Sequence, residues 1–128
     1  MTLLNPAESP TELLHRLHQP HQWVVACYCA EWCDTCRSYR PHFAQLAASR
    51  PQDVFVWVDI EDSEEMLDDE DVENFPTLLV QGPQGNVFYG PMLPHIEHLQ
   101  QLLERLEADA PPLPQGPAPL KGLLAAAQ

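Results

Sequence analysis

The order of apolar and polar residues along the chain predicts four strands. Residues 23–29 and 54–60 are unbroken runs of apolar and β-prone residues, long enough for buried strands and too short for helices. Two shorter strands are expected over residues 77–80 and 86–89. Between them lies Gly82-Pro83-Gln84-Gly85, a connection typical of a hairpin.

Three further segments repeat apolar residues at helical spacing. A short helix opens at Pro10-Thr11-Glu12 and stops at Pro20. A second helix runs from about Asp34 and contains Pro41, which should kink it. The third is an amphipathic helix over residues 95–107, with its leucines and one isoleucine on one face.

An acidic segment, residues 61–73, completes the order α-β-α-β-α-β-β-α, and residues 2–4 add a vestigial strand in front. Two βα units followed by a hairpin and a helix predict an α/β fold whose central mixed sheet carries helices on both faces. Right-handed crossovers place the two long strands centrally. The loop that holds Cys33 then lies at the carboxyl end of a strand.

The acidic segment itself has two interpretations. Nine of the thirteen residues from 61 to 73 are Asp or Glu. Such a run is usually the solvated face of a helix. The alternative is that its charge steers a basic partner towards the protein.

Composition changes sharply once, at Asp109. Five of the fourteen prolines lie between Pro111 and Pro119, and alanine and leucine follow. Proline lacks a backbone donor and favours extended conformations. We therefore expect one domain over residues 1–108 and a disordered Pro/Ala-rich tail over residues 109–128.

Charge excludes several classes of partner. The 128 residues carry six Lys or Arg against nineteen Asp or Glu, a net charge of −13. Nucleic acid and anionic membrane surfaces both attract basic proteins, so neither is an expected partner. No apolar run approaches the roughly 18 residues that span a bilayer. No basic residue precedes Arg16 and no cleavable apolar stretch is present, so we expect no secretory signal and a cytoplasmic protein. We also expect a monomer.

The four cysteines, Cys27, Cys29, Cys33 and Cys36, all fall within ten residues. This clustering favours a redox or metal site over a disulfide framework. Cys33 lies where a strand passes into a helix, and a helix N-terminus stabilises a thiolate. Cys33 is thus the candidate nucleophile, and Cys36, one turn later, can close a disulfide with it and exchange electrons with a substrate disulfide.

The same region resembles the thioredoxin family. The similar features are the stretch Ala30–Cys36 with Trp32 before the first cysteine, Pro41 in the helix, the loop Phe75-Pro76-Thr77, and the glycines Gly85 and Gly90. The resemblance covers roughly residues 11–107 and implies a thioredoxin-like fold.

The resemblance also implies an activity and a site. Cys33 attacks a client disulfide and Cys36 resolves the mixed disulfide, while Trp32 and Phe75 contact the substrate. Pro76, as a cis-proline, keeps the loop open to substrate and away from metal. The implied partners are a disulfide-containing protein client and a thiol reductase or dithiol donor, with no metal and no bound cofactor.

Three departures from the family pattern bear on the redox chemistry. Cys27 stands where the family usually has a buried acid, and Trp57 where it usually has a lysine. A group proposed to take the proton from Cys36 is then missing, so water or a substrate group would serve. Asp34-Thr35 separates the two cysteines in place of the family's Gly-Pro. The negative charge of Asp34 disfavours a thiolate at Cys33, and the positive charge of Arg37 can offset it.

Other interpretations of the cysteines stay open. Cys27 and Cys29 lie two residues apart on a strand, so their side chains face the same side. Both can be small core side chains. Alternatively, Cys29 is a third thiol near the active disulfide. Zinc or iron–sulfur ligation would require a turn where a rigid strand is expected. A non-enzymatic client-binding or chaperone-like module is the alternative function; loss of the acid–lysine pair favours it and retention of both cysteines argues against it.

Overall fold

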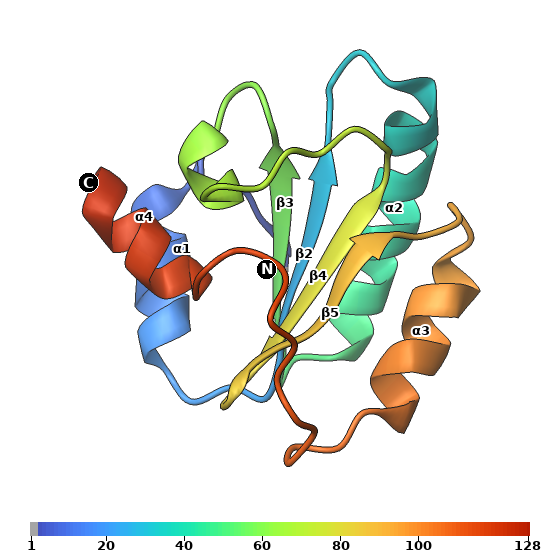
Figure 1. Cartoon of the computed structure of the whole chain (residues 1–128). Coiled ribbons are helices and arrows are strands. Elements are labelled where there is room, and N and C mark those ends of the chain that lie inside the picture. Colours follow the sequence, from blue (N-terminus) through green and yellow to red (C-terminus); the bar gives the residue numbers. More distant parts are fainter. Residues whose placement is uncertain (1–2) are drawn as a thin grey trace.

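The computed structural model describes residues 3–128, so Thr2 of the predicted first strand lies outside the described residues. The elements, in chain order, are β1 (Leu3–Leu4), α1 (Pro10–His18), β2 (Val24–Cys29), α2 (Asp34–Ser49), β3 (Val54–Asp59), the 3₁₀-helix η1 (Glu64–Leu67), β4 (Thr77–Gly82), β5 (Gly85–Pro91), α3 (Ile96–Arg105) and α4 (Leu120–Ala127). One five-stranded sheet lies between helices on both of its faces (Figure 1).

The sheet confirms the predicted mixed α/β architecture. Its strand order is β1-β3-β2-β4-β5, with β1, β3 and β2 parallel and with β4 and β5 antiparallel to their neighbours. The two long strands, β2 and β3, are interior, as expected from their unbroken apolar runs. Their register pairs Cys27 with Trp57 and Cys29 with Asp59, so the carboxyl ends of both strands meet at one edge.

Alternation along β2 divides the core into two halves. Val25, Cys27 and Cys29 belong to the half that contains residues of α2 and α3. The residues between them, with Tyr28 at the end, belong to the half that contains residues of α1, η1 and α4. Because both faces are covered, every residue of β2 is buried, which explains a strand without polar alternation.

The acidic segment forms less helix than predicted. Its only helical part among the described residues is η1, where Met66 is fully buried. Eight of the nine acidic side chains in residues 61–73 are exposed, and Glu70 is half-buried. Like charges at helical spacing repel one another, and few apolar anchors are present, so the connection follows the surface as a loop.

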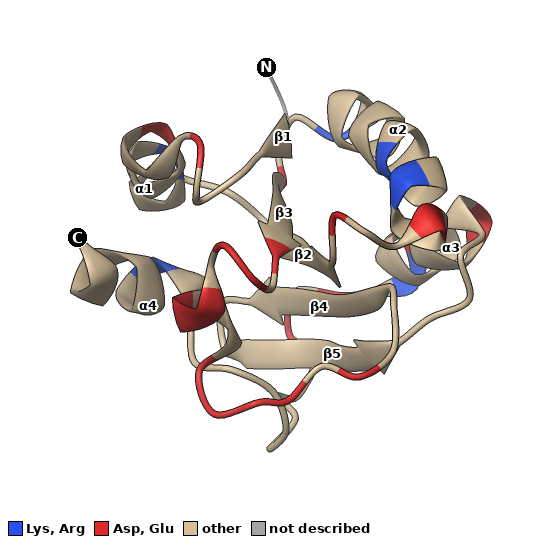
Figure 2. Ribbon diagram, turned by 90° about the horizontal axis from the view of Figure 1, so that it is seen from above, with Lys and Arg blue, Asp and Glu red and all other residues tan. Residues whose placement is uncertain are grey.

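The C-terminal tail, for which the sequence predicts disorder, packs against the sheet in the structure and ends in the helix α4. Residues 106–119 cross β5, and α4 packs beside α1 and η1 (Figures 1 and 2). Leu120 and Leu124, one helical turn apart, are fully buried in the core. Tail carbonyls accept hydrogen bonds from side-chain amides of the sheet: Asn86 Nδ2 donates to Pro117 O (2.9 Å) and Gln81 Nε2 to Ala118 O (3.0 Å).

The prolines therefore reduce the number of backbone hydrogen-bond donors in the tail without preventing the tail from packing on the sheet. A proline-rich segment has few N–H groups but keeps every carbonyl, and two amide side chains on the sheet supply the missing donors.

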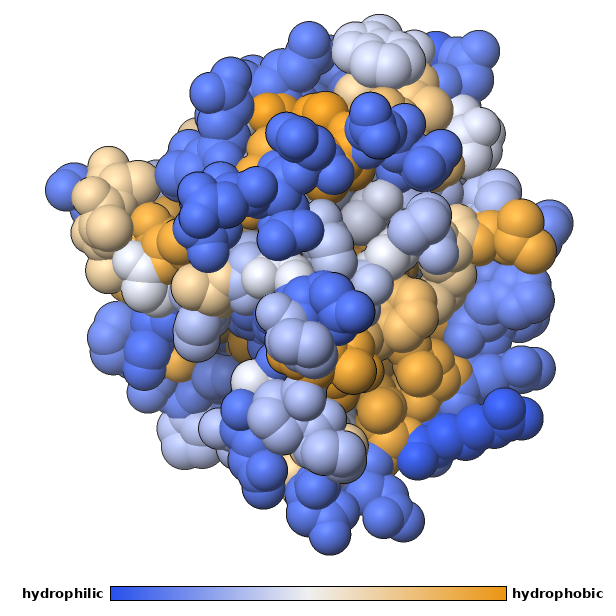
Figure 3. Space-filling model, viewed as in Figure 1, coloured by the Kyte–Doolittle hydropathy of each residue, from blue (hydrophilic) through white to orange (hydrophobic). Residues whose placement is uncertain are grey.

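Figure 3 shows a mostly hydrophilic face, with apolar atoms gathered between the tail and α3, where residues of β5 and α3 pack against the core. Within residues 3–128, no helix is both long enough and apolar enough to cross a membrane.

Candidate functional site

Cys33 occupies the N-cap of α2, at the edge where β2 and β3 end. Its N–H donates to Ala30 O (3.1 Å), and its carbonyl accepts the N–H of Arg37 (3.1 Å). These two bonds fix the cysteine at the start of the helix. The first-turn N–H groups of a helix lack intrahelical partners and carry positive partial charge, so Cys33 lies at the positive end of α2. The side chain is half-buried, so solvent and a client can reach it.

Cys36 lies on the inner face of α2 and forms a disulfide with Cys29 at the end of β2. The sequence predicted instead that Cys36 would pair with Cys33, which is a free thiol in the structure. Both bonded cysteines are 1% exposed. Their Cα atoms are 5.8 Å apart, within the usual disulfide range, because Cys36 points from the helix towards the sheet face that carries Cys29.

Cys27 is the second free cysteine and is fully buried. Its Sγ lies 3.7 Å from Cys29 Sγ, so the two cysteine side chains of β2 share a face as predicted. Burial raises the pKa of the Cys27 thiol well above its ordinary value, which keeps it protonated. Cys27 thus fits the description of a small core side chain, whereas Cys29 takes part in a bond.

Two aromatic side chains stand next to Cys33. Trp32 is 63% exposed and meets Phe75 edge-on, with ring centroids 5.6 Å apart. Phe75 and Cys33 both pack against the same core half, and the Phe75–Pro76 peptide bond is cis. Pro76 is buried, and its carbonyl accepts the N–H of Met92 (3.1 Å). The structure therefore brings Trp32, Phe75 and Pro76 to the same edge as the half-buried thiol.

The residues between and after the two cysteines of the motif lie on the surface. Asp34 forms an ion pair with Arg37, whose Nη1 also donates to Glu31 O (2.7 Å). Their side chains are 90% and 57% exposed, so solvent screens the pair strongly. Thr35 is exposed as well. Arg37 thus offsets the charge of Asp34 and ties the Glu31 loop to α2.

A cavity of about 310 Å³ adjoins Cys36. Arg40, Trp57 and Asp59 line it, and the Arg40 guanidinium lies 5.2 Å from the Trp57 ring centroid. Asp59 is 8% exposed, and its carboxylate accepts the N–H groups of Glu31 (3.1 Å) and Glu61 (2.9 Å). The sequence interpretation missed Asp59. It is an acidic residue near the end of a buried strand, and that strand lies beside the one that carries Cys27 and Cys29. Its position in the sequence could therefore have predicted a carboxylate near the cysteines.

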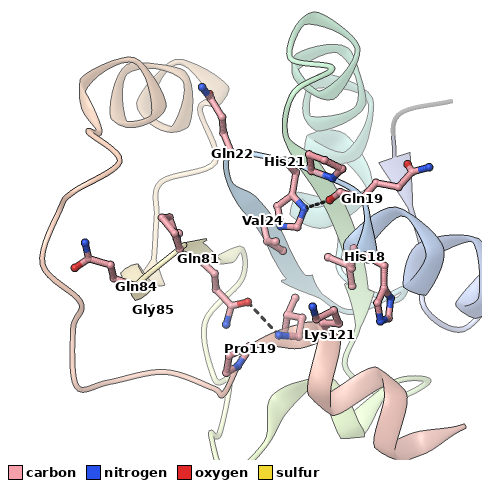
Figure 4. Close-up of a pocket in the computed structure, with 15 residues that line it drawn as sticks. His18, Gln19, His21, Gln22, Val24, Gln81, Gln84, Gly85, Pro119 and Lys121 are labelled. Atoms are coloured by element: carbon pink, nitrogen blue, oxygen red, sulfur yellow. Dashed lines mark hydrogen bonds between the residues drawn. The ribbon is translucent and has the colours of Figure 1, made fainter.

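A second, larger cavity lies at the opposite ends of the strands, and no cysteine or methionine lines it. It has a volume of about 610 Å³ and lies between the end of α1, the β4–β5 hairpin and the start of α4 (Figure 4). The cavity is lined by His18, His21 and Lys121 and by Val24, the first residue of β2, whereas Cys29 is the last residue of that strand. In residues 3–128, no three His, Cys, Asp or Glu side chains gather as a metal site would require.

Comparison with known families identifies this arrangement. The thioredoxin family model matches residues 7–104, which is more than half of the chain. The chain belongs to the thioredoxin family. Thioredoxin H5 of Oryza sativa subsp. japonica is 30% identical over 79 residues, which cover 62% of this chain and 58% of that protein. Thioredoxin domain-containing protein 2 of Rattus norvegicus is 39% identical over 54 residues, which cover 42% of this chain but 10% of its own length. This thioredoxin-family chain thus spans less than two thirds of either relative.

Solved thioredoxins share the fold. Thioredoxin O1 from Arabidopsis thaliana superposes with a TM-score of 0.65 at 18% identity, covering 83% of this chain and 98% of that one. The germline-specific thioredoxin Deadhead from Drosophila melanogaster gives 0.67 at 16% identity, covering 84% and 100%. At such identities the likeness establishes the thioredoxin fold, and the family match ends before the tail and α4 begin.

Proposed function

We propose that this thioredoxin-family protein is a thiol–disulfide oxidoreductase that reduces or exchanges disulfides in protein clients. One observation carries the proposal. Cys33 is a free, half-buried thiol at the N-terminus of α2, with the exposed Trp32 beside it and the buried sulfur of Cys36 three residues on. A nucleophile, a resolving cysteine and an apolar contact surface are the parts that disulfide exchange requires.

The proposed reaction begins with attack by the Cys33 thiolate on one sulfur of a client disulfide. A Cys33–client bond forms, the client S–S bond breaks, and the second client sulfur leaves as a thiolate that takes up a proton. The Cys36 thiolate then attacks Cys33 Sγ, which forms a Cys33–Cys36 bond and releases the first client sulfur. The client gains two electrons and the protein loses two, so the sum balances.

Deprotonation of Cys36 requires an acceptor. Cys27 cannot act as one, because it is a buried thiol with a raised pKa. The cavity beside Cys36 is lined by polar groups and is large enough for water. Water in that cavity is therefore our proposed acceptor, in agreement with the family acid being absent from position 27.

The proposed partners follow from this chemistry and from charge. The client is a protein that carries a disulfide, and electrons return from a thiol reductase or another dithiol protein. The net charge of −13 argues against nucleic acid and anionic membranes as partners. A cytoplasmic location is part of the proposal, since the cysteines cluster at one site instead of bracing the fold. We also propose that the protein acts as a monomer.

Reduction of insulin with dithiothreitol as electron donor tests the activity. The wild type should accelerate loss of the insulin disulfides, and Cys33→Ser should not. Mixed with insulin after removal of dithiothreitol, reduced Cys36→Ser should accumulate a mixed disulfide between Cys33 and insulin, visible by mass. A wild type that fails to accelerate reduction, while remaining folded by circular dichroism, would refute the proposal.

The exposed Trp32 next to Phe75 supports a second candidate, a client-binding module in which the cysteines are incidental. A protein with Cys33→Ser and Cys36→Ser decides between the two. Retained capture of unfolded insulin chains by this variant, together with no reductase activity in the wild type, would favour binding over chemistry.

A further inference from the structure

We propose that Cys29 is a third redox-active cysteine, which takes the disulfide over from Cys33 and Cys36. The oxidised protein then stores its disulfide as the buried Cys29–Cys36 bond and regenerates Cys33 as a free thiol. This inference rests on the proposed function and adds one step to it.

The geometry for this step is present at the end of β2. Cys36 is bonded to Cys29, with 5.8 Å between their Cα atoms, while Cys33 is free and packs against the core half that contains both. Cys36 also lies one helical turn from Cys33, at the spacing of a redox CxxC pair. Cys36 is therefore placed between two cysteines, one on the solvent side and one on the sheet side.

The added step is a thiol–disulfide exchange within the protein. Cys29 Sγ, as a thiolate, attacks Cys36 Sγ of the Cys33–Cys36 disulfide. The Cys29–Cys36 bond forms, the Cys33–Cys36 bond breaks, and Cys33 leaves as a thiolate that accepts the proton lost by Cys29. No oxidant or reductant is consumed, because one disulfide and one thiol are present before and after the step.

Cys27 does not compete with Cys29 for this role. It lies on the same strand face, 3.7 Å from Cys29 Sγ, and is equally buried, yet it remains a free thiol in the structure. Cys29 is bonded to Cys36, which lies in the first turn of α2. Cys27 lies two residues earlier on β2, farther from that helix end, and pairs with Trp57 of β3. Cys27 is thus a matched control for Cys29.

The relay has a consequence for the direction of electron flow. Cys29 and Cys36 are each 1% exposed, so a bulky external thiol reaches neither sulfur. Electrons must return through Cys33, whose thiolate attacks Cys36 Sγ and re-forms the Cys33–Cys36 bond, in which an external thiol can reach the half-buried Cys33. With Cys36 held by Cys29, Cys33 also has no resolving partner, so a client that it captures in this state stays bound.

Disulfide mapping of the oxidised wild type tests the relay directly. The protein is oxidised by one equivalent of insulin disulfide, alkylated with iodoacetamide without unfolding, and digested. Cleavage after Glu31 and before Asp34 separates Cys29, Cys33 and Cys36 onto different peptides, and cleavage after Tyr28 separates Cys27 from Cys29. We expect a Cys29–Cys36 link and an alkylated Cys33. A Cys33–Cys36 link with no label on Cys33 would overturn the relay.

Two serine variants separate the relay from the oxidoreductase activity. Cys29→Ser should still reduce insulin in a single turnover. Its disulfide should stay between Cys33 and Cys36, so Cys33 of the oxidised variant should not be alkylated, in contrast to the wild type. Cys27→Ser should behave as the wild type in both respects. If all three proteins reduce insulin and all map to Cys33–Cys36, the relay is wrong and the activity stands. If none reduces insulin, the proposed function itself fails.

Discussion

At the scale of single residues, Cys33 is the one cysteine of the four that solvent reaches, and the disulfide lies behind it. We therefore expect Cys33→Ser, after oxidation by the small reagent diamide, to keep its Cys29–Cys36 bond in the presence of glutathione. The wild type should be reduced at least about tenfold faster, because its Cys33 thiolate opens the buried bond from inside. Quenched-flow alkylation followed by mass measurement gives both rates.

Equal rates in the two proteins would show that glutathione reaches the buried sulfurs directly. Cys27→Ser is the control, since it removes a thiol from the same strand without touching Cys33. It should be reduced at the wild-type rate.

Two buried tyrosines differ in how their hydroxyls are satisfied. Tyr28 Oη donates to Met66 O (2.9 Å), whereas the Tyr39 hydroxyl has no hydrogen-bond partner among residues 3–128. Tyr28→Phe should lower the free energy of unfolding by about 1 kcal/mol, because it leaves a carbonyl without its donor. Tyr39→Phe should be neutral or slightly stabilising. Urea unfolding at neutral pH, followed by tryptophan fluorescence, measures both.

The same tyrosines predict a loss of stability in alkali. Burial raises the pKa of both Tyr28 and Tyr39 above the ordinary value. Above about pH 10 the unfolded chain loses phenolic protons that the native protein retains, so the native state binds more protons and stability falls as pH rises. Each Phe substitution should make this fall less steep. An unchanged slope of unfolding free energy against pH in both variants would contradict the assignment.

Individual residues also show how far sequence reasoning reached in the site. The CxxC spacing and the strand-to-helix position were sufficient to place Cys33, because both follow from local sequence. The Cys29–Cys36 bond depends on which cysteine of β2 faces the inner side of α2 at bonding distance, and that depends on helix packing. Asp59 reaches the site through strand register, another non-local property.

At the scale of elements, Gly116 is a position where the tail packs tightly against β5. This residue has φ of +98°, and an added Cβ would lie 2.8 Å from Asn86 Nδ2 and 3.2 Å from Tyr89 Cβ. Gly116→Ala should therefore destabilise the protein by about 1–3 kcal/mol through backbone strain and lost tail contacts. Equilibrium urea unfolding measures the change.

Gly122 provides the matched substitution in the same tail. It lies within α4, and an added Cβ would meet no atom within 4 Å. Gly122→Ala should stabilise the protein by up to about 1 kcal/mol, because alanine favours the helix. If both substitutions leave stability unchanged, the tail does not dock in solution.

Elements with strong periodicity were predictable, and those whose order depends on distant contacts were not. The unbroken apolar runs of β2 and β3 and the leucine spacing of α3 fix their structure locally. The tail looked disordered because its prolines remove backbone donors. The side-chain amides that donate to its carbonyls belong to Asn86 and Gln81, which lie 31 residues before Pro117 and 37 residues before Ala118 respectively. Leu120 and Leu124 become an informative pair only once α1 and η1 are seen beneath them.

At the scale of the whole molecule, negative charge is concentrated at the edge that carries the site. The acidic connection leaves β3 just after Asp59 and returns at Phe75, which meets Trp32. Figure 2, which looks down on this edge, shows it as a nearly continuous acidic band around η1 and β5, while basic residues lie mainly on the helices. A disulfide in a basic client would therefore approach Cys33 down a favourable potential.

We expect the second-order rate of Cys33 with a basic disulfide peptide to fall by roughly tenfold as salt is raised from low to molar concentration, since the Debye length shrinks from about 30 Å to 3 Å. An acidic peptide of the same length should react faster with added salt.

Two double variants test whether the acidic connection is responsible. The double substitution Asp62→Asn and Glu73→Gln, in the acidic connection, should weaken the salt dependence for the basic peptide. Glu107→Gln with Asp109→Asn removes the same charge beyond the far end of α3 and should leave it nearly unchanged. Identical slopes for the two double variants would mean that net charge, and not the acidic connection, sets the encounter rate.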